Sequence, residues 1–156
     1  GDDFTADIME FMRKQHNILI GERTAERIKI EVGSALSELE NPPADIAVHG
    51  RDMMTGVPKE INIGYSEIAH ALDKSITKIE AAVMNALELT PPELAADIYR
   101  TGLYMAGGGS LLRGLDKRIA MKTRLPVHIA EDPLRAVARG TGIALKNFDK
   151  FPFLIK

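Results

Sequence analysis

A run of glycines stands where a short apolar segment gives way to an amphipathic one. Gly107, Gly108 and Gly109 follow the apolar residues 103–106, and Ser110 opens a helical pattern. Glycine has no Cβ and tolerates positive φ, so another molecule can approach this backbone closely. Free N–H groups at a helix start favour a polar or anionic ligand, and ligands of open α/β sheets bind beyond the carboxyl ends of strands. The run therefore indicates either a nucleotide or phosphate loop or a simple tight turn.

The run matches neither of the two common phosphate-binding signatures. No Gly-Lys-Ser/Thr follows the glycines, which excludes a Walker loop. Leu112 stands where the dinucleotide fingerprint requires a glycine. Spacing alone therefore leaves both interpretations of the run open.

A second candidate set lies on a predicted helix over residues 22–32. Like charges recur there at a spacing of four, in the pairs Glu22 with Glu26 and Arg23 with Arg27. Each such pair costs about a few tenths of a kcal/mol unless other groups engage it. Pairing of Glu26 with Lys29 offsets part of the cost, and Arg27 can do the same with Glu31. The charged face is either simply solvated or held at a binding cleft.

Composition excludes several classes of protein. The 156 residues include no cysteine, which excludes disulfides, thiolate metal sites and thiol catalysis. Basic and acidic residues are interspersed at a net charge of −2, so no nucleic-acid interface is expected. No apolar run reaches the roughly 20 residues that span a bilayer. The histidines show no metal-ligand spacing, and structural or surface roles are expected for all four: His16, His49, His70 and His128.

Apolar periodicity predicts helices and one hairpin in the first 90 residues. The helices begin at Asp2 or Asp3, at Glu22 and at Ser66, and residues 17–21 break the pattern after the first. Their apolar stripes are Phe4, Ile8, Phe11 and Met12; Ala25, Ile28, Val32 and Leu36; and Ile68, Leu72, Ile76, Ile79, Val83 and Leu87. Alternation on either side of a turn at 50–56 predicts a β-hairpin.

The remainder alternates strand and helix. A short helix opens at Pro91-Pro92, where proline suits a first turn. Strands are predicted at 103–106 and 126–130, with a helix at 110–123 between them that buries Leu111, Leu112, Leu115 and Ile119. A strand, a crossover helix and a strand make a parallel pair, hence an α/β layer. Asp132-Pro133 opens a last helix with the stripe Leu134, Val137, Ala138, Thr141 and Leu145.

Four strings of residues resemble the MreB family of bacterial actin-like proteins, in that family's order. They are Ile20–Lys29, Thr90–Leu94 with Asp97-Ile98, Gly107–Leu115, and Glu131–Leu134 with Val137–Gly140. The resemblance runs from end to end of the chain. It implies an α/β, actin-like (ribonuclease H-like) ATPase fold, of which this chain is the C-terminal half with a small α+β insertion subdomain.

The resemblance also implies an organisation and a site. Residues 1–33 and 90–147 would form the α/β nucleotide-binding subdomain, 34–89 the smaller insertion with the hairpin and long helix, and 148–156 a C-terminal tail. The implied nucleotide-binding residues are Glu26, Arg27, Ile28 and Lys29 on one side and Gly107, Gly108, Gly109 and Ser110 on the other. Glu26 would accept hydrogen bonds from ribose hydroxyls, and Lys29 would lie along the adenine edge.

The complete protein is expected to bind ATP with Mg²⁺ and to be an ATPase. In the family, the phosphate hairpins and the catalytic and metal-holding acids lie before the position of Gly1, so we expect this chain to be a piece that does not hydrolyse ATP alone. The complete protein would polymerise into cytoplasmic filaments, peripheral at the inner face of the cytoplasmic membrane, that control rod shape and peptidoglycan synthesis. Implied partners are other copies of itself, MreC, MreD, RodZ and the cell-wall elongation synthases. The alternatives are a sugar-kinase half or a heat-shock chaperone nucleotide domain of the same superfamily.

Two surface segments leave alternatives open. Met53-Met54 in the hairpin loop either packs within the loop or is a contact point. The tail over residues 148–156 carries three of the five phenylalanines. Aromatic residues interleaved with lysines can lie at a membrane interface, or they can cover a hydrophobic face of the same protein. The stretch is short and Pro152 interrupts it, which favours packing.

Overall fold

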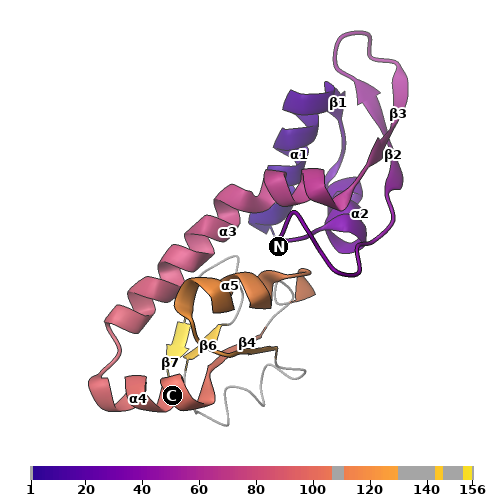
Figure 1. The fold of residues 1–156 in the computed structure, drawn as a ribbon. Coiled ribbons are helices and arrows are strands. Elements are labelled where there is room, and N and C mark those ends of the chain that lie inside the picture. Colours follow the sequence, from indigo (N-terminus) through magenta and orange to yellow (C-terminus); the bar gives the residue numbers. More distant parts are fainter. Residues whose placement is uncertain (1, 107–110, 130–142, 146–152, 156) are drawn as a thin grey trace. The chain divides into compact units, whose positions relative to one another are not determined.

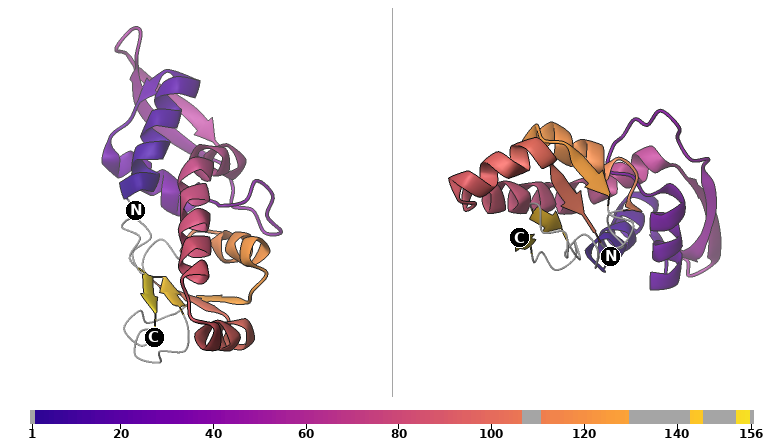
Figure 2. Two further views of the ribbon diagram at one scale, coloured as in Figure 1. Left: turned by 90° about the vertical axis from the view of Figure 1, so that its left-hand side faces the viewer. Right: turned by 90° about the horizontal axis from the view of Figure 1, so that it is seen from below.

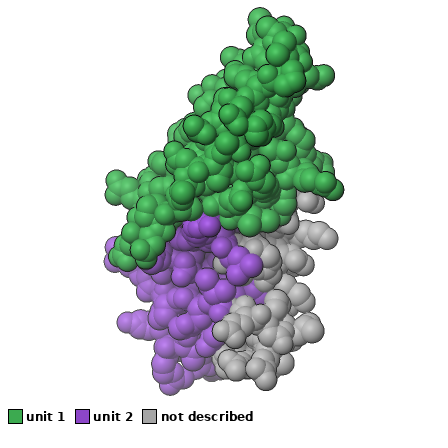
Figure 3. All heavy atoms as spheres, turned by 90° about the vertical axis from the view of Figure 1, so that its right-hand side faces the viewer, with its two compact units in different colours: residues 1–75 green, residues 76–156 purple. Residues whose placement is uncertain are grey.

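The structure is a computed structural model that describes residues 2–106, 111–129, 143–145 and 153–155. The chain divides into two compact units, Gly1–Ser75 (unit 1) and Ile76–Lys156 (unit 2), which Figure 3 colours separately. The boundary falls inside the long helix α3 (Tyr65–Glu88). Each unit has its own β-sheet and its own buried side chains.

Unit 1 joins an antiparallel sheet to two helices ahead of α3. Its elements are α1 (Asp2–His16), β1 (Ile18–Leu19), α2 (Glu22–Val32), β2 (Ile46–Asp52) and β3 (Pro58–Ile63). The strand order is β1-β2-β3, and both pairs are antiparallel. α1 contacts α2 and β1, and α2 contacts β2 (Figures 1 and 2). The predicted first and second helices and the predicted hairpin are thus confirmed.

The core of unit 1 follows the apolar stripes of the sequence. Its buried apolar side chains are Phe4, Ile8, Met12, Ile18, Ala25, Ile28, Val32, Ala35, Val48, Ile63, Ile68, Ala69 and Leu72. Burial of a large apolar side chain contributes roughly 1.5–3 kcal/mol, so this cluster supplies most of the driving force for folding unit 1. Phe11 and Leu36, which the stripes include, are only half-buried and lie at the margins of their apolar faces.

The segment between α1 and α2, predicted only to interrupt the helical pattern, contains a short strand. Ile18 and Leu19 form β1, whose backbone pairs with Asp52 and Arg51 of β2. Asn17 takes a positive φ of 51°, which turns the chain between α1 and β1. A strand of two residues has no periodicity of its own, and it exists because a distant strand pairs with it.

The hairpin turn is shorter than predicted, because β2 continues through Gly50 to Asp52. A Cβ at Gly50 would lie 2.5 Å from the carbonyl oxygen of Leu19, so only glycine allows β1 to approach β2 this closely. Asp52 then closes the turn. Its Oδ2 accepts hydrogen bonds from the backbone N–H groups of Met54 (3.0 Å) and Thr55 (2.8 Å).

Unit 2 contains the second part of α3 and a mixed sheet. Its other elements are α4 (Pro92–Thr101), β4 (Leu103–Met105), α5 (Leu115–Thr123), β5 (Val127–Ile129), β6 (Ile143–Leu145) and β7 (Phe153–Ile155). The strand order is β5-β4-β6-β7. β4 pairs in parallel with both β5 and β6, and β7 pairs antiparallel with β6. The long helix, the short helix at Pro92 and the predicted parallel pair of strands are confirmed, and the fold class is α/β.

Three features of unit 2 differ from the sequence predictions. α5 begins at Leu115 and not at Ser110, because Gly114 takes a left-handed φ of 76° directly before it. Leu111, which precedes the true helix start, is 77% exposed, although the predicted helix buries it. Leu145 lies in β6 and not on a last helix. The segment that Asp132-Pro133 opens lies outside the described residues up to position 142.

An ion pair with little solvent exposure joins α5 to α3 within unit 2. Arg118 Nη2 lies 3.1 Å from Glu80 Oε1 and donates to Thr77 Oγ1 at 3.2 Å. The side chains of Arg118 and Glu80 are only 15% and 13% exposed. The pair therefore fixes how α5 lies on the second part of α3.

The two compact units do not test the subdomain organisation implied by the resemblance. The contacts of α1 and α2 with the β1–β3 sheet place residues 1–33 in the same unit as the hairpin. The assignment of residues 1–33 and 90–147 to one nucleotide-binding subdomain, with 34–89 as an insertion, stays a prediction. The predicted tail over 148–156 contains β7, which is an edge strand of the unit 2 sheet.

Candidate functional site

The predicted site residues divide between a described and an undescribed segment. Glu26, Arg27, Ile28 and Lys29 lie in α2 of unit 1. The other four, Gly107, Gly108, Gly109 and Ser110, lie outside the described residues. Whether both segments border one adenosine therefore stays a prediction, and the geometry that can be described is that of α2 and its surroundings.

The charged face of α2 is organised by ion pairs along the helix. Lys29 Nζ lies 2.9 Å from Glu26 Oε1, and Arg27 Nε lies 2.8 Å from Glu31 Oε2. Both pairs are those expected from the spacing of the sequence. Lys29 is the most sheltered of these four side chains, at 17% exposed. One member of each like-charged pair, Glu26 and Arg27, is thus engaged by a partner of opposite sign.

Glu26 is held from two directions. Thr5 of α1 donates a hydrogen bond from Oγ1 to Glu26 Oε2 at 3.1 Å, while Lys29 engages Oε1. The hydrogen bond from Lys29 is the main cause that lowers the pKa of Glu26 below its ordinary value, and the bond from Thr5 acts in the same direction. The carboxylate is therefore ionised at neutral pH and acts as a hydrogen-bond acceptor.

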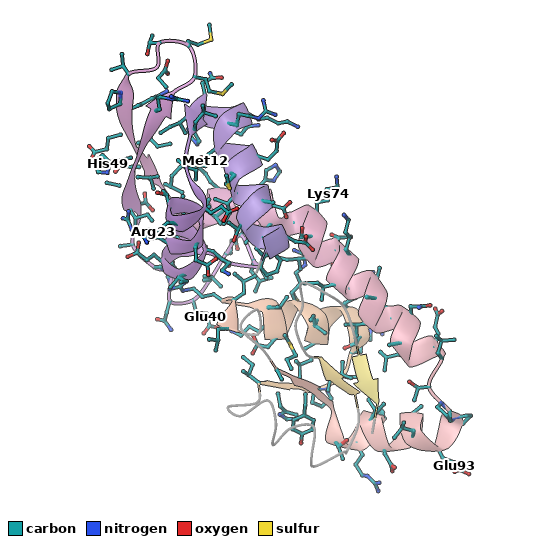
Figure 4. All side chains as sticks on the ribbon, turned by 180° about the vertical axis from the view of Figure 1, so that it is seen from behind. Met12, Arg23, Glu40, His49, Lys74 and Glu93 are labelled. Carbon is teal, nitrogen blue, oxygen red and sulfur yellow. The ribbon has the colours of Figure 1, made fainter. Side chains whose placement is uncertain are left out.

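A surface hollow of about 460 Å³ opens beside this carboxylate, between α1 and α2. Its lining consists of Thr5, Ala6, Met9, Glu22, Arg23 and Glu26. Figure 4 labels Arg23 on α2 in this region. Spacing and resemblance pointed to Glu22 and Glu26. Neither signal predicted the α1 wall of the hollow, which consists of Thr5, Ala6 and Met9. These three residues flank the apolar stripe of α1 and belong to no motif.

Arg27 and Ile28 contact other parts of unit 1 and do not line the hollow. Arg27 Nη2 donates to the backbone carbonyl of Ala47 at 3.1 Å, which ties α2 to β2. The Ile28 side chain is completely buried in the core. Of the four predicted residues on α2, Glu26 borders the hollow with its side chain, and Lys29 fixes Glu26.

Three of the four histidines contact side chains of their own units, and His70 is exposed. His16 Nε2 lies 2.8 Å from Glu67 Oε1, and His49 Nε2 lies 2.8 Å from Glu60 Oε1. The ring of His128 packs near that of Tyr104, with 5.0 Å between centroids. Within the described part of the chain, no three His, Asp or Glu side chains are grouped so that they could hold a metal ion.

Comparison with known proteins identifies the family. A family model described as MreB/Mbl protein matches residues 1–152. The chain belongs to the MreB/Mbl family. It is 48% identical over 149 residues to the cell shape-determining protein MreB of Escherichia coli (strain K12), a match that covers 96% of this chain and 42% of that protein. It is 43% identical over 152 residues to the cell shape-determining protein Mbl of Bacillus subtilis (strain 168), covering 97% of this chain and 45% of Mbl.

Solved structures of MreB relatives share the fold. The crystal structure of MreB 5 of Spiroplasma citri bound to AMPPNP matches with a TM-score of 0.81 at 41% identity, over 90% of this chain and 41% of that one. The ADP-bound MreB5 structure matches with a TM-score of 0.80 at 41% identity, over 88% of this chain and 41% of that one. A non-polymerising mutant of MamK matches at 20% identity with a TM-score of 0.64, which concerns the fold alone. The actin-like fold is thereby confirmed.

The MreB/Mbl match has two further consequences. It decides against the sugar-kinase and chaperone alternatives, because it is specific to another family and covers nearly the whole chain. The chain spans less than half the length of the relatives it matches, at 45% of Mbl and 42% of MreB.

Among the helices of the described residues, none is both long and apolar enough to cross a membrane.

Proposed function

We propose that this chain is the C-terminal half of a cell shape-determining, actin-like ATP-binding protein, and that α2 supplies one wall of its nucleotide cleft. The MreB5 relatives bound to AMPPNP and ADP support nucleotide binding, because they share this fold at 41% identity. The proposed nucleotide-binding set is Glu26, Arg27, Ile28 and Lys29 with Gly107, Gly108, Gly109 and Ser110. Phosphate-binding and Mg²⁺-holding groups would come from the part of the protein before this chain.

The observation that carries the proposal is the ionised Glu26 at the hollow between α1 and α2. A carboxylate accepts hydrogen bonds and donates none, so it suits the ribose hydroxyls, which are donors. Hydrogen bonds to charged groups are roughly twice as strong as those between neutral groups. Lys29, held 2.9 Å from Glu26, keeps the carboxylate charged and places a cation near the same ligand.

The wider function follows from the family. The complete protein would bind and hydrolyse ATP and assemble into filaments at the inner face of the cytoplasmic membrane. There it would organise cell-wall synthesis with MreC, MreD, RodZ and the elongation synthases. The hairpin loop would be a self-contact, since Met53 and Met54 are 40% and 84% exposed and are not packed within the loop.

Nucleotide titrations of the complete protein test the proposed site. Glu26→Ala and Lys29→Ala should each weaken ATP binding by about ten- to a hundredfold, the range for losing hydrogen bonds to charged groups. Glu31→Ala is the matched control. It lies on the same helix and is also ion-paired, but it does not line the hollow. Unchanged ATP affinity in both site variants would refute the role of α2.

Electron microscopy of the complete protein with ATP tests assembly. Protofilaments are expected with ATP and should be lost or shortened in the Glu26→Ala variant, whose nucleotide site is weakened. A protein that binds ATP but never forms filaments under any nucleotide condition would contradict the filament proposal while leaving the nucleotide site intact.

A further inference from the structure

Thr5 is a residue of the hollow that neither the motifs nor the resemblance singled out. It lies on α1, one turn ahead of Met9, and both residues line the hollow. Its hydroxyl reaches a side chain of a different helix, 21 residues away in sequence, at 3.1 Å. Threonine hydroxyls in helices commonly bond to nearby backbone carbonyls, so a bond to a carboxylate on another helix is a specific tertiary contact.

The contact leaves part of the carboxylate available. A carboxylate has about four lone-pair positions on its two oxygens. Lys29 engages Oε1 and Thr5 engages Oε2. About two positions therefore remain for donors from a ligand, and the two existing bonds fix the direction in which those positions point. The Glu26 side chain is 47% exposed, so it can meet a ligand from the solvent side.

A carboxylate held in this way is preorganised. A glutamate side chain has several rotatable bonds, and fixing it during binding costs conformational entropy. Thr5 and Lys29 order the Glu26 carboxylate before any ligand arrives. Because α1 and α2 pack against each other within unit 1, the bond from Thr5 joins the two walls of the hollow.

We propose that Thr5 is a positioning residue that orients Glu26 toward the ribose hydroxyls of the bound nucleotide and so favours ribonucleotides over deoxyribonucleotides. This inference rests on the proposed function of α2. It adds a residue from α1 to that site, and it assigns a selectivity to the pair formed by Thr5 and Glu26.

The test uses three nucleotides and matched variants of the complete protein. Thr5→Val keeps the shape of the side chain and removes the hydroxyl, and Thr5→Ser restores a hydroxyl. Thr101→Val is the control, because its hydroxyl donates to the Asp97 carbonyl of its own helix in unit 2. Affinities are measured for ATP, 2′-deoxy-ATP and 3′-deoxy-ATP, together with the melting temperature of each variant.

Thr5→Val should weaken ATP binding by about three- to tenfold, the effect of one net hydrogen bond. Its affinity for 2′-deoxy-ATP should change less than about twofold, because the 2′-hydroxyl that Glu26 would bind is already missing. Thr5→Ser should restore ATP affinity, and Thr101→Val should not change it. In a Glu26→Ala background, Thr5→Val should have no further effect on affinity.

Two results would overturn the role of Thr5 alone. One is wild-type ATP affinity in Thr5→Val while Glu26→Ala is impaired. The other is an equal loss for all three nucleotides, which would mean general damage to the hollow. A wild-type protein that does not bind ATP, or a Glu26→Ala variant that binds it normally, would overturn the proposed function itself.

Discussion

Two isoleucines on α2 allow a matched test of how this helix is held in unit 1. Ile28 is completely buried, whereas Ile30, two residues along the same helix, is 64% exposed. Replacing isoleucine by alanine removes three carbons. At roughly 0.8 kcal/mol for each buried carbon, the transfer contribution at Ile28 is about 2.4 kcal/mol. The cavity left in a packed core adds to this, so Ile28→Ala should lower the free energy of unfolding by about 3–4 kcal/mol.

The same change at Ile30 should have little effect. An exposed side chain gains little from burial, and alanine is the better helix former, so Ile30→Ala should stay within about 0.5 kcal/mol of wild type. Ile28→Val removes one carbon and should cost about 0.5–1.5 kcal/mol. Urea denaturation followed by far-UV circular dichroism measures all three variants. Equal losses at Ile28 and Ile30, or a loss below about 1 kcal/mol for Ile28→Ala, would refute the core position of Ile28.

Two further predictions concern the sheet of unit 1. Gly50→Ala should destabilise it by about 1–3 kcal/mol, because the new Cβ would lie 2.5 Å from the carbonyl oxygen of Leu19. Gly21→Ala, where nothing lies within 4 Å of the added atom, should cost less than about 1 kcal/mol in the same denaturation experiment. The hairpin turn should also depend on pH. Hydrogen bonds, chiefly from the Thr55 backbone, lower the pKa of Asp52 from its ordinary value of 3.8. Their stabilisation is therefore present above that value and is lost as the pH falls through the lower pKa of the folded state. The protection of amides in β2 and β3 against hydrogen exchange, relative to unfolded chain at the same pH, should fall in that range. Asp52→Asn should abolish this pH dependence; an unaltered dependence in Asp52→Asn would assign it to other groups.

Long periodic segments were predictable because their pattern repeats over several turns. The stripe Ile68, Leu72, Ile76, Ile79 and Val83 marks α3, and each of these residues is buried. The ion pairs of Glu26 with Lys29 and of Arg27 with Glu31 follow from helical spacing alone. Family membership was also readable, because several strings of residues occur together in one order.

Local signals failed where distant parts of the chain decide the structure, or where a residue type permits more than one backbone conformation. β1 exists because β2 pairs with it, and no pattern in residues 18–19 shows this. α5 begins at Leu115 and not at the predicted Ser110, because Gly114 adopts a left-handed backbone conformation that glycine permits but does not require. The wall that α1 gives to the hollow depends on how two helices pack, and motifs do not encode it.

The sequence by itself determined α1, α2, α3 and α4, the hairpin, the parallel strand pair and the family, because these depend on spacing along the chain. Only the tertiary structure decided which charged residues of α2 make specific contacts and which are simply solvated. It tied Arg27 to the Ala47 carbonyl and left Glu26 at an open hollow with a bond from Thr5. The physical reason is that helical spacing decides which side chains share a face of α2, whereas the packing of neighbouring elements decides which atoms that face contacts.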